Sequence, residues 1–103
     1  MNTKLQNQNT AFLYEAVLAL RTPEECARFF EDLCTVTELK ALSQRVVVAK
    51  MLSEKCVYSD IVAATGASTA TISRVNRSLN YGCDAYSLVF GRMEEQAEEK
   101  EKK

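Results

Sequence analysis

Histidine and tryptophan are absent from this sequence of 103 residues, which also has one proline and three glycines. Without histidine, the chain lacks the usual general base near neutral pH, the commonest zinc ligand and the usual partner of a serine or cysteine nucleophile. No close pair of acids in a plausible cleft and no glycine-rich phosphate loop offers an alternative catalytic group. The sequence therefore predicts a protein that is not an enzyme.

Long apolar runs are also missing, since no stretch approaches the roughly 18 residues that a membrane-spanning helix needs. The apolar stretch near the N-terminus is interrupted by Glu15, which fits a cleaved signal peptide poorly. The four cysteines, Cys26, Cys34, Cys56 and Cys83, have no Cys-x-x-Cys spacing, so reduced and partly buried thiols are favoured over a metal site. We expect a cytoplasmic protein with no metal, no cofactor of its own and no membrane partner.

The composition favours a helical fold. Few prolines and glycines, with abundant Ala, Leu, Glu and Lys, argue against a turn-rich β protein. A chain of this length with 47% apolar residues supports about one domain with its own core. We predict one folded all-α domain over residues 1–93 and a charged, frayed tail over 94–103.

Apolar spacing and capping residues locate the first helices. Apolar side chains from Phe12 to Leu20 recur at helical intervals. Thr22-Pro23-Glu24-Glu25 has the residues of a capping box, with Glu25 reaching back to the Thr22 amide, and Thr35-Val36-Thr37-Glu38 repeats the pattern. The third helix is apolar on every face at residues 46–49, which predicts that other helices or a partner chain surround it. A short strand at the three valines is the alternative.

Charge is distributed unevenly along the chain. Residues 1–39 have three basic and six acidic groups, and residues 84–103 have four and six. Residues 40–83 have six basic groups and two acidic ones, and no acid lies between Ile61 and Gly82. A locally cationic segment in a chain of net charge −1 is compatible with an anionic partner at one face.

The segment YSDIVAATGASTATISRVNRSL, residues 58–79, is organised as two helices joined by a tight turn. We predict a helix over 58–65 with Ile61 inward, a turn at Gly66, which tolerates positive φ, and a second helix capped by Ser68. Apolar residues of the second helix face inward and small or basic ones face outward: Ile72, Val75 and Leu79 against Ala70, Ser73, Arg74 and Arg77. This pattern is typical of a helix-turn-helix whose second helix enters the DNA major groove, and a solvated surface hairpin is the alternative.

The segment from Thr35 to Leu79, a long helix followed by GASTATISRVNRSL, resembles the Trp repressor superfamily, in particular its YerC/YecD-type relatives in bacteria. The likeness extends from about Leu13 to Phe90, and the block TGASTATISRVNRSLNYG is specific. The resemblance implies an all-helical subunit of about six helices and an intertwined homodimer. It also implies that two helix-turn-helix units meet successive turns of double-stranded DNA, with half-sites about 34 Å apart.

The resemblance also implies which residues contact DNA. Ser59 matches a basic DNA-contacting position on the first helix of the motif, and the loss of that basic group removes a phosphate partner. Ser68, Thr69, Ala70 and Ser73 match positions that meet base edges. Arg74 and Arg77 supply the two positive charges of the outward face, which reach phosphates or guanine edges. The function predicted is a sequence-specific transcriptional regulator, and a helical protein-interaction module with the same fold is the alternative.

An effector site is the remaining implication. In the Trp repressor an indole lies between two arginine planes, and polar groups bind the carboxylate. The matching residues are Arg45, Arg74, Thr35, Thr71 and Ser78. The glycine that follows the second arginine in the repressor is Val75 here, and its branched side chain occupies space that the ligand uses. We therefore expect L-tryptophan not to be bound tightly. The alternatives are another small effector, or an arginine pair held by helix C-terminal carbonyls or by acids such as Asp60.

Overall fold

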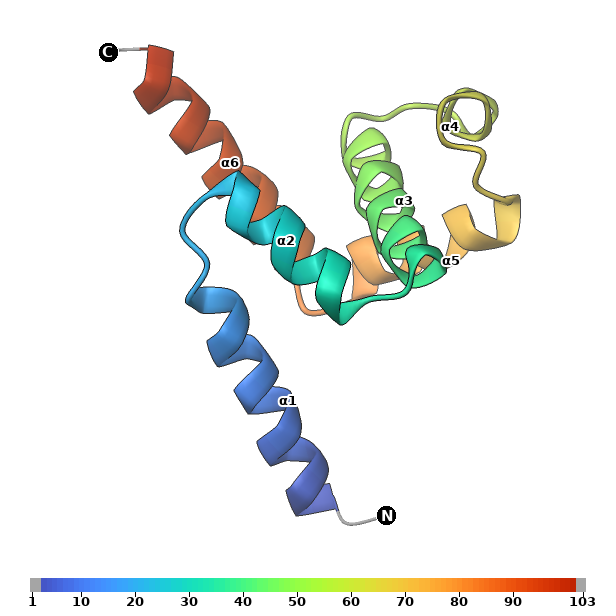
Figure 1. Cartoon of the computed structure of the whole chain (residues 1–103). Coiled ribbons are helices and arrows are strands. Elements are labelled where there is room, and N and C mark those ends of the chain that lie inside the picture. Colours follow the sequence, from blue (N-terminus) through green and yellow to red (C-terminus); the bar gives the residue numbers. More distant parts are fainter. Residues whose placement is uncertain (1–2, 102–103) are drawn as a thin grey trace. The chain divides into compact units, whose positions relative to one another are not determined.

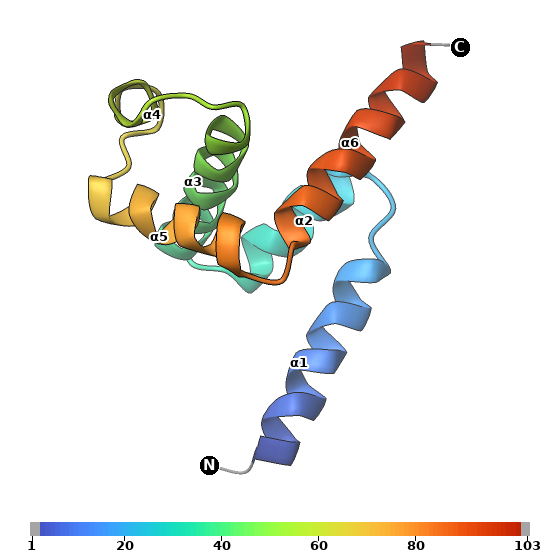
Figure 2. The same ribbon diagram turned by 180° about the vertical axis from the view of Figure 1, so that it is seen from behind.

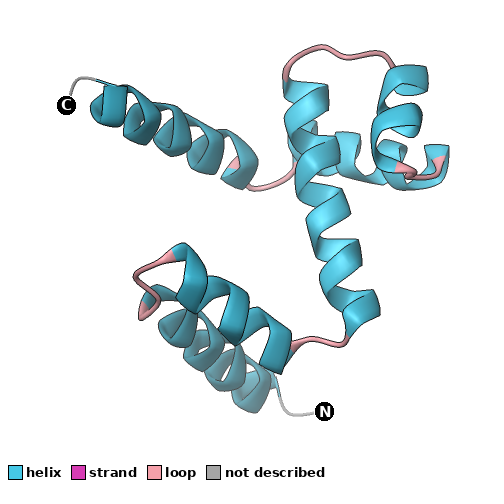
Figure 3. Cartoon of the chain, turned by 45° about the horizontal axis from the view of Figure 1, so that its top comes forward, coloured by secondary structure: helices cyan, strands magenta, loops and turns pink. Residues whose placement is uncertain are grey.

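The computed structural model describes residues 3–101, and over them the chain forms six α-helices (Figure 1). Their bounds are α1 (Thr3–Leu18), α2 (Pro23–Leu33), α3 (Val36–Ser53), α4 (Tyr58–Thr65), α5 (Thr69–Tyr81) and α6 (Ala85–Glu101). Figure 3 shows helices joined by short loops, with no strand in this part of the chain. The all-α prediction is confirmed. The strand alternative at residues 46–49 is wrong, because these residues lie inside the continuous helix α3.

Side-chain caps begin α2 and α3 where the sequence predicts them. The amide of Glu25 donates to the Thr22 hydroxyl (3.1 Å), and that of Glu38 donates to the Thr35 hydroxyl (3.1 Å). Glu38 completes a reciprocal box by accepting from the Thr35 amide (2.8 Å), whereas Glu25 accepts from the Arg21 amide (2.8 Å) instead of the expected Thr22 amide. The hydrogen bond from the Thr35 amide keeps the pKa of Glu38 below its usual value. The charged carboxylate therefore stabilises this helix start at neutral pH, and that contribution is lost as pH falls through the lowered pKa.

The chain divides into two contact units, residues 1–39 and residues 40–103. All the buried residues of the described chain belong to the second unit and form one apolar cluster: Val48, Ala49, Leu52, Ile61, Ala67, Ile72, Val75 and Phe90. They come from α3, α4, α5, α6 and the turn before α5. Figure 2 shows these helices from behind. This core positions the two helices of the predicted DNA-binding motif against α3.

The first unit has no fully buried side chain among residues 7–39. Phe12 is 71% exposed and Leu18 is 83% exposed on α1, and α2 buries none of its residues completely. Phe29 and Phe30 contact each other edge to face and are half-buried. The apolar side chains of α1 and α2 therefore remain accessible to solvent in the single chain.

Two helices differ in length from the sequence expectation. Helix α1 begins at Thr3, well before Phe12, and α6 continues through Glu101, where we expected a frayed tail from residue 94. Glu, Gln, Ala and Lys in this tail are strong helix formers. Lys50 also pairs with Glu94 (3.7 Å) and lies 5.2 Å from the centre of the Phe90 ring, which connects α3 to α6. None of the helices over residues 3–101 is long and apolar enough to cross a membrane.

Candidate nucleic-acid interface

The turn between α4 and α5 is built on a glycine in the left-handed region. Gly66 has φ of 71° and its amide donates to the Val62 carbonyl (2.9 Å), which closes the last turn of α4. The Thr65 hydroxyl donates to the Ile61 carbonyl (2.7 Å) and accepts from the Ala67 amide (3.1 Å). Ala67 is only 2% exposed, so the turn is anchored at its centre. The predicted positive φ at Gly66 is confirmed.

A long-range hydrogen bond holds this turn against the central helix. Nε2 of Gln44, on α3, donates to the Thr65 carbonyl (3.2 Å), and Gln44 is half-buried. Sequence analysis did not identify Gln44 or Thr65 as part of the site. The only indication in the sequence was a polar residue beside the buried face of α3. That pattern does not identify a hydrogen-bond partner 21 residues away.

Gly66 and Gly91 offer a matched pair of substitutions. An added Cβ would contact nothing within 4 Å at either position, so packing does not distinguish them. Gly66→Ala is expected to lower the free energy of unfolding by about 1–2 kcal/mol, because alanine opposes positive φ. Gly91→Ala, within α6, is expected to raise it by about 0.5–1 kcal/mol. Urea unfolding measures both, and a shift of the same sign in the two variants would contradict the turn geometry.

Helix α5 has the predicted two faces. The Ser68 hydroxyl accepts from the Thr71 amide (3.1 Å) and donates to the Thr71 hydroxyl (3.1 Å), so Ser68 is the N-cap. Ile72 is 0% exposed and Val75 is 2% exposed, while Leu79 is half-buried. The opposite face is solvent-exposed at every DNA-contact candidate on this helix and its cap: Ser68, Thr69, Ala70, Ser73, Arg74 and Arg77.

The exposed face of α5 carries small side chains and a positive charge. Arg74 and Arg77 are the two charged residues of this helix, and neither forms an ion pair with another residue of the 3–101 range. Ser59 is exposed in the first turn of α4, next to the acid Asp60. Small side chains permit close approach to a groove, and guanidinium groups can bind phosphates or guanine edges. The DNA-contact candidates thus lie on α4, α5 and the cap of α5, and both helices contribute buried residues to the core.

The effector candidates lie at the start of α3, within α3 and on α5. Thr35 precedes α3, and its hydroxyl caps this helix by accepting from the Glu38 amide. Arg45 is half-buried on α3 and Arg74 is exposed on α5, whereas Thr71 is engaged with the Ser68 cap. Ser78 is exposed, and its carbonyl accepts from the Gly82 amide (2.9 Å).

Val75 packs within the apolar cluster, so its side chain fills the core beside Arg74 where a glycine would leave space.

The four cysteines are free thiols: Cys34 and Cys56 are half-buried as expected, and Cys26 and Cys83 are exposed. No group of three or more metal-ligating side chains occurs in the part of the chain that the structure describes.

A helix-turn-helix presented by an all-helical core is typical of DNA-binding proteins, and comparison with known proteins identifies the family. The family model described as Trp repressor protein matches residues 8–94, and the chain belongs to this family. YerC of Bacillus subtilis (strain 168), which is named as uncharacterised, is 51% identical over 92 residues, covering 89% of this chain and 88% of YerC. The protein is therefore a YerC-type relative of the Trp repressor.

Two crystal structures have the same fold. A TrpR-like protein from Eubacterium eligens ATCC 27750 superposes with a TM-score of 0.83 at 56% identity, over 89% of this chain and 95% of that one. A provisionally named Trp repressor from Staphylococcus aureus also has a TM-score of 0.83, at 50% identity over 88% of this chain and 91% of that one. The predicted Trp repressor-like fold is confirmed.

Proposed function

We propose that the protein is a sequence-specific DNA-binding transcriptional regulator that acts in the cytoplasm and inserts α5 into the major groove. The observation that carries this proposal is the division of α5 into a buried face, Ile72 and Val75, and an exposed face of small residues and two arginines. Family membership supports it, because the family is one of regulators. The DNA-contacting residues proposed are Ser59, Ser68, Thr69, Ala70, Ser73, Arg74 and Arg77.

The regulator is proposed to act as a homodimer. In the first unit Phe12, Tyr14 and Leu18 expose 61–83% of their surface along α1. In the second unit α3 and α6 each expose several large apolar side chains, namely Leu42, Val46 and Val47, and Leu88, Val89 and Met93. Apolar surface of this extent is typical of an interface. A symmetric dimer would bury these helices and present two copies of α5 to one face of the DNA.

L-Tryptophan is proposed not to be a tight effector of this regulator. Val75 fills the core at the position where a glycine provides room in the Trp repressor, and Thr35 is committed to its cap. Arg45 and Arg74 are then available for solvent, DNA or a different small effector. The proposed fold and DNA-binding face do not depend on whether tryptophan is bound.

Selection of genomic DNA fragments by the purified protein, at about 150 mM salt with and without L-tryptophan, tests the function. We expect enrichment of a palindromic site, with half-sites about one helical turn apart, in both conditions. Enrichment with tryptophan alone would contradict the proposal for Val75. The matched control is a protein carrying Thr69→Ala, which should change the preferred sequence.

A protein-interaction module is the second candidate function, because the exposed apolar surfaces of α1, α3 and α6 also suit a partner protein. Failure to enrich any fragment in either condition would favour this candidate over the DNA-binding regulator. Weak binding to every fragment without sequence preference would have the same consequence.

A further inference from the structure

A second polar site lies at the C-terminal end of α5. A pocket of about 480 Å³ is located between the end of α3, the C-terminal half of α5 and the start of α6. Its lining consists of Leu52, Ser53, Lys55, Cys56, Asn76, Leu79, Asn80 and Ser87. Small-molecule sites commonly measure about 300–1,000 Å³. The pocket contains none of the DNA-contact or effector candidates named above.

The lining has the chemistry of an anion site. Lys55 is its one charged side chain and no acid lines it, so the pocket is net positive. The Lys55 ammonium, Nδ2 of Asn76 and the Ser87 hydroxyl can donate hydrogen bonds to carboxylate or phosphate oxygens. The Ser53 hydroxyl already donates to the Lys50 carbonyl (2.6 Å). Leu52 and Leu79 provide an apolar wall for the carbon skeleton of a ligand. The combination suits a small organic molecule with one oxyanion group better than it suits an apolar ligand.

Lys55 occupies a backbone position that favours glycine. After α3, the Cys56 amide donates to the Met51 carbonyl and the Lys55 amide donates to the Leu52 carbonyl, both at 3.0 Å. This is the Schellman arrangement, in which the residue at the position of Lys55 adopts positive φ, here 66°. A lysine there costs stability relative to glycine, and strained positions of this kind cluster at ligand sites.

The carboxamides of α5 are held in one arrangement. Nδ2 of Asn80 donates both to the backbone carbonyl of Asn76 (3.0 Å) and to its Oδ1 (3.1 Å). The N–H donors of Asn80 are thereby used within α5, which holds the Asn76 carboxamide on the wall of the pocket and leaves its Nδ2 as the donor for a ligand. A side chain held in one arrangement before binding lowers the entropic cost of binding a polar ligand.

We propose that this pocket binds a small metabolite bearing a carboxylate or phosphate group, with Lys55 pairing with the oxyanion and the Asn76–Asn80 pair contacting its polar body. A ligand in this position contacts α3, α5 and α6 together, so it restrains the helix that carries the DNA-contacting face. The regulatory half of this proposal rests on the function proposed above. The binding half does not.

Alkylation of Cys56 measures occupancy of the pocket without any DNA. The thiol lines the pocket and is half-buried, while the exposed Cys26 and Cys83 of the same molecule serve as internal controls. The full-length protein is treated with iodoacetamide in potassium phosphate, in potassium acetate or in potassium chloride at equal ionic strength, and each cysteine is quantified by peptide mass spectrometry. We expect phosphate or acetate to slow alkylation of Cys56 several-fold and saturably, and to leave Cys83 unaffected. The two probes distinguish a phosphate ligand from a carboxylate.

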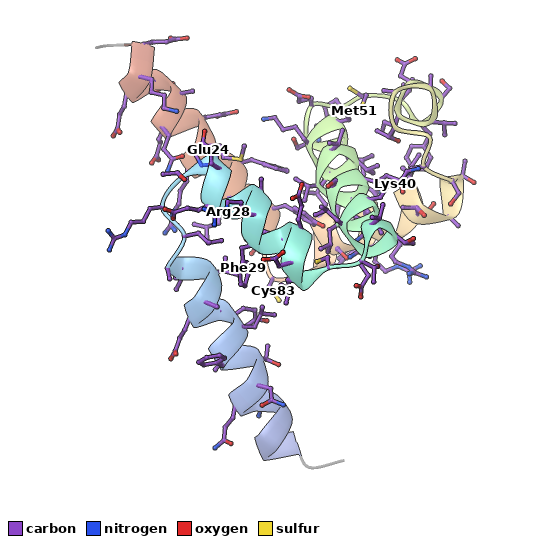
Figure 4. All side chains as sticks on the ribbon, in the orientation of Figure 1. Glu24, Arg28, Phe29, Lys40, Met51 and Cys83 are labelled. Atoms are coloured by element: carbon purple, nitrogen blue, oxygen red, sulfur yellow. The ribbon has the colours of Figure 1, made fainter. Side chains whose placement is uncertain are left out.

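Lys55→Gly separates binding from folding. It removes the ammonium group and relieves the positive φ, so the variant should unfold at higher urea concentration while the half-saturating probe concentration rises about tenfold or more. Lys40→Ala is the control, because Lys40 lies at the other end of α3 from Met51 and the pocket (Figure 4). Absence of protection by both probes, or equal protection in the Lys55→Gly variant, would overturn the proposed site.

The regulatory half is tested by titrating the selected DNA fragment with and without the protecting probe. We expect a several-fold change in DNA affinity in the wild-type protein and none in the Lys55→Gly variant. Equal DNA affinities with and without probe in the wild type would overturn regulation through this pocket. If no fragment is selected at all, the proposed function fails while the alkylation result still decides the ligand site.

Discussion

Replacing Arg77 with alanine is expected to weaken binding to all DNA sequences and to flatten the dependence of affinity on salt. Arg77 is exposed on α5 and forms no ion pair with any residue from 3 to 101, so its charge is available to a phosphate. Each phosphate contact that is lost reduces the slope of log K against log salt by about one unit. A dimer carries Arg77 twice, so the slope should fall by about two. Fluorescence anisotropy titrations at several salt concentrations measure this slope.

Thr69→Ala is the comparison for this experiment. Thr69 is the first residue of α5, exposed and uncharged, in a position that suits contact with a base edge. Its loss should alter sequence preference by about 1–3 kcal/mol at one base pair and leave the salt slope unchanged. Unchanged affinity and unchanged sequence preference in both variants would remove α5 from the DNA interface.

Replacing Ile72 with alanine is expected to produce the largest loss of stability, about 2–5 kcal/mol. Ile72 is completely buried, on the inward face of α5, within the cluster that also contains Ile61 and Val48. Truncation removes apolar contact area and leaves a cavity at the point where α5 packs on the core. Urea unfolding followed by circular dichroism, at one fixed protein concentration, measures the change.

Val62→Ala provides the control for Ile72→Ala. Val62 is a branched aliphatic residue on α4 that is 38% exposed, so its truncation should cost less than about 1 kcal/mol. A loss at Val62 equal to that at Ile72 would show that the helix pair is not packed as described. The difference between the two variants therefore tests the core that supports the DNA-contacting face.

Local features of this fold were predictable from the sequence. The caps at Thr22, Thr35 and Ser68 and the positive φ at Gly66 all occur where expected. Each depends on a hydrogen bond or a steric limit within four residues, so the residue types alone specify it. The burial of Ile72 likewise follows from helical periodicity.

Predictions that depended on partners or on chain ends were less accurate. Glu25 was expected to accept from Thr22 and accepts from Arg21, since both amides are within reach of one flexible carboxylate. The segment after residue 93 was expected to fray and is helical to Glu101, because helix propensity there does not require a buried face. Exposure of Cys26 and Cys83 likewise depends on how the helices pack, which composition does not specify.

For this protein, the order of amino acids alone determined the helices, the turn at Gly66 and the division of α5 into an apolar and a polar face. Only the tertiary structure revealed the hydrogen bond from Gln44 to Thr65, the core position of Val75 and the pocket around Lys55. The physical reason is the range of the interactions. Capping and periodicity act over one or two helical turns. These three features instead join residues that are far apart in the sequence and become neighbours only when α3, α4, α5 and α6 pack together.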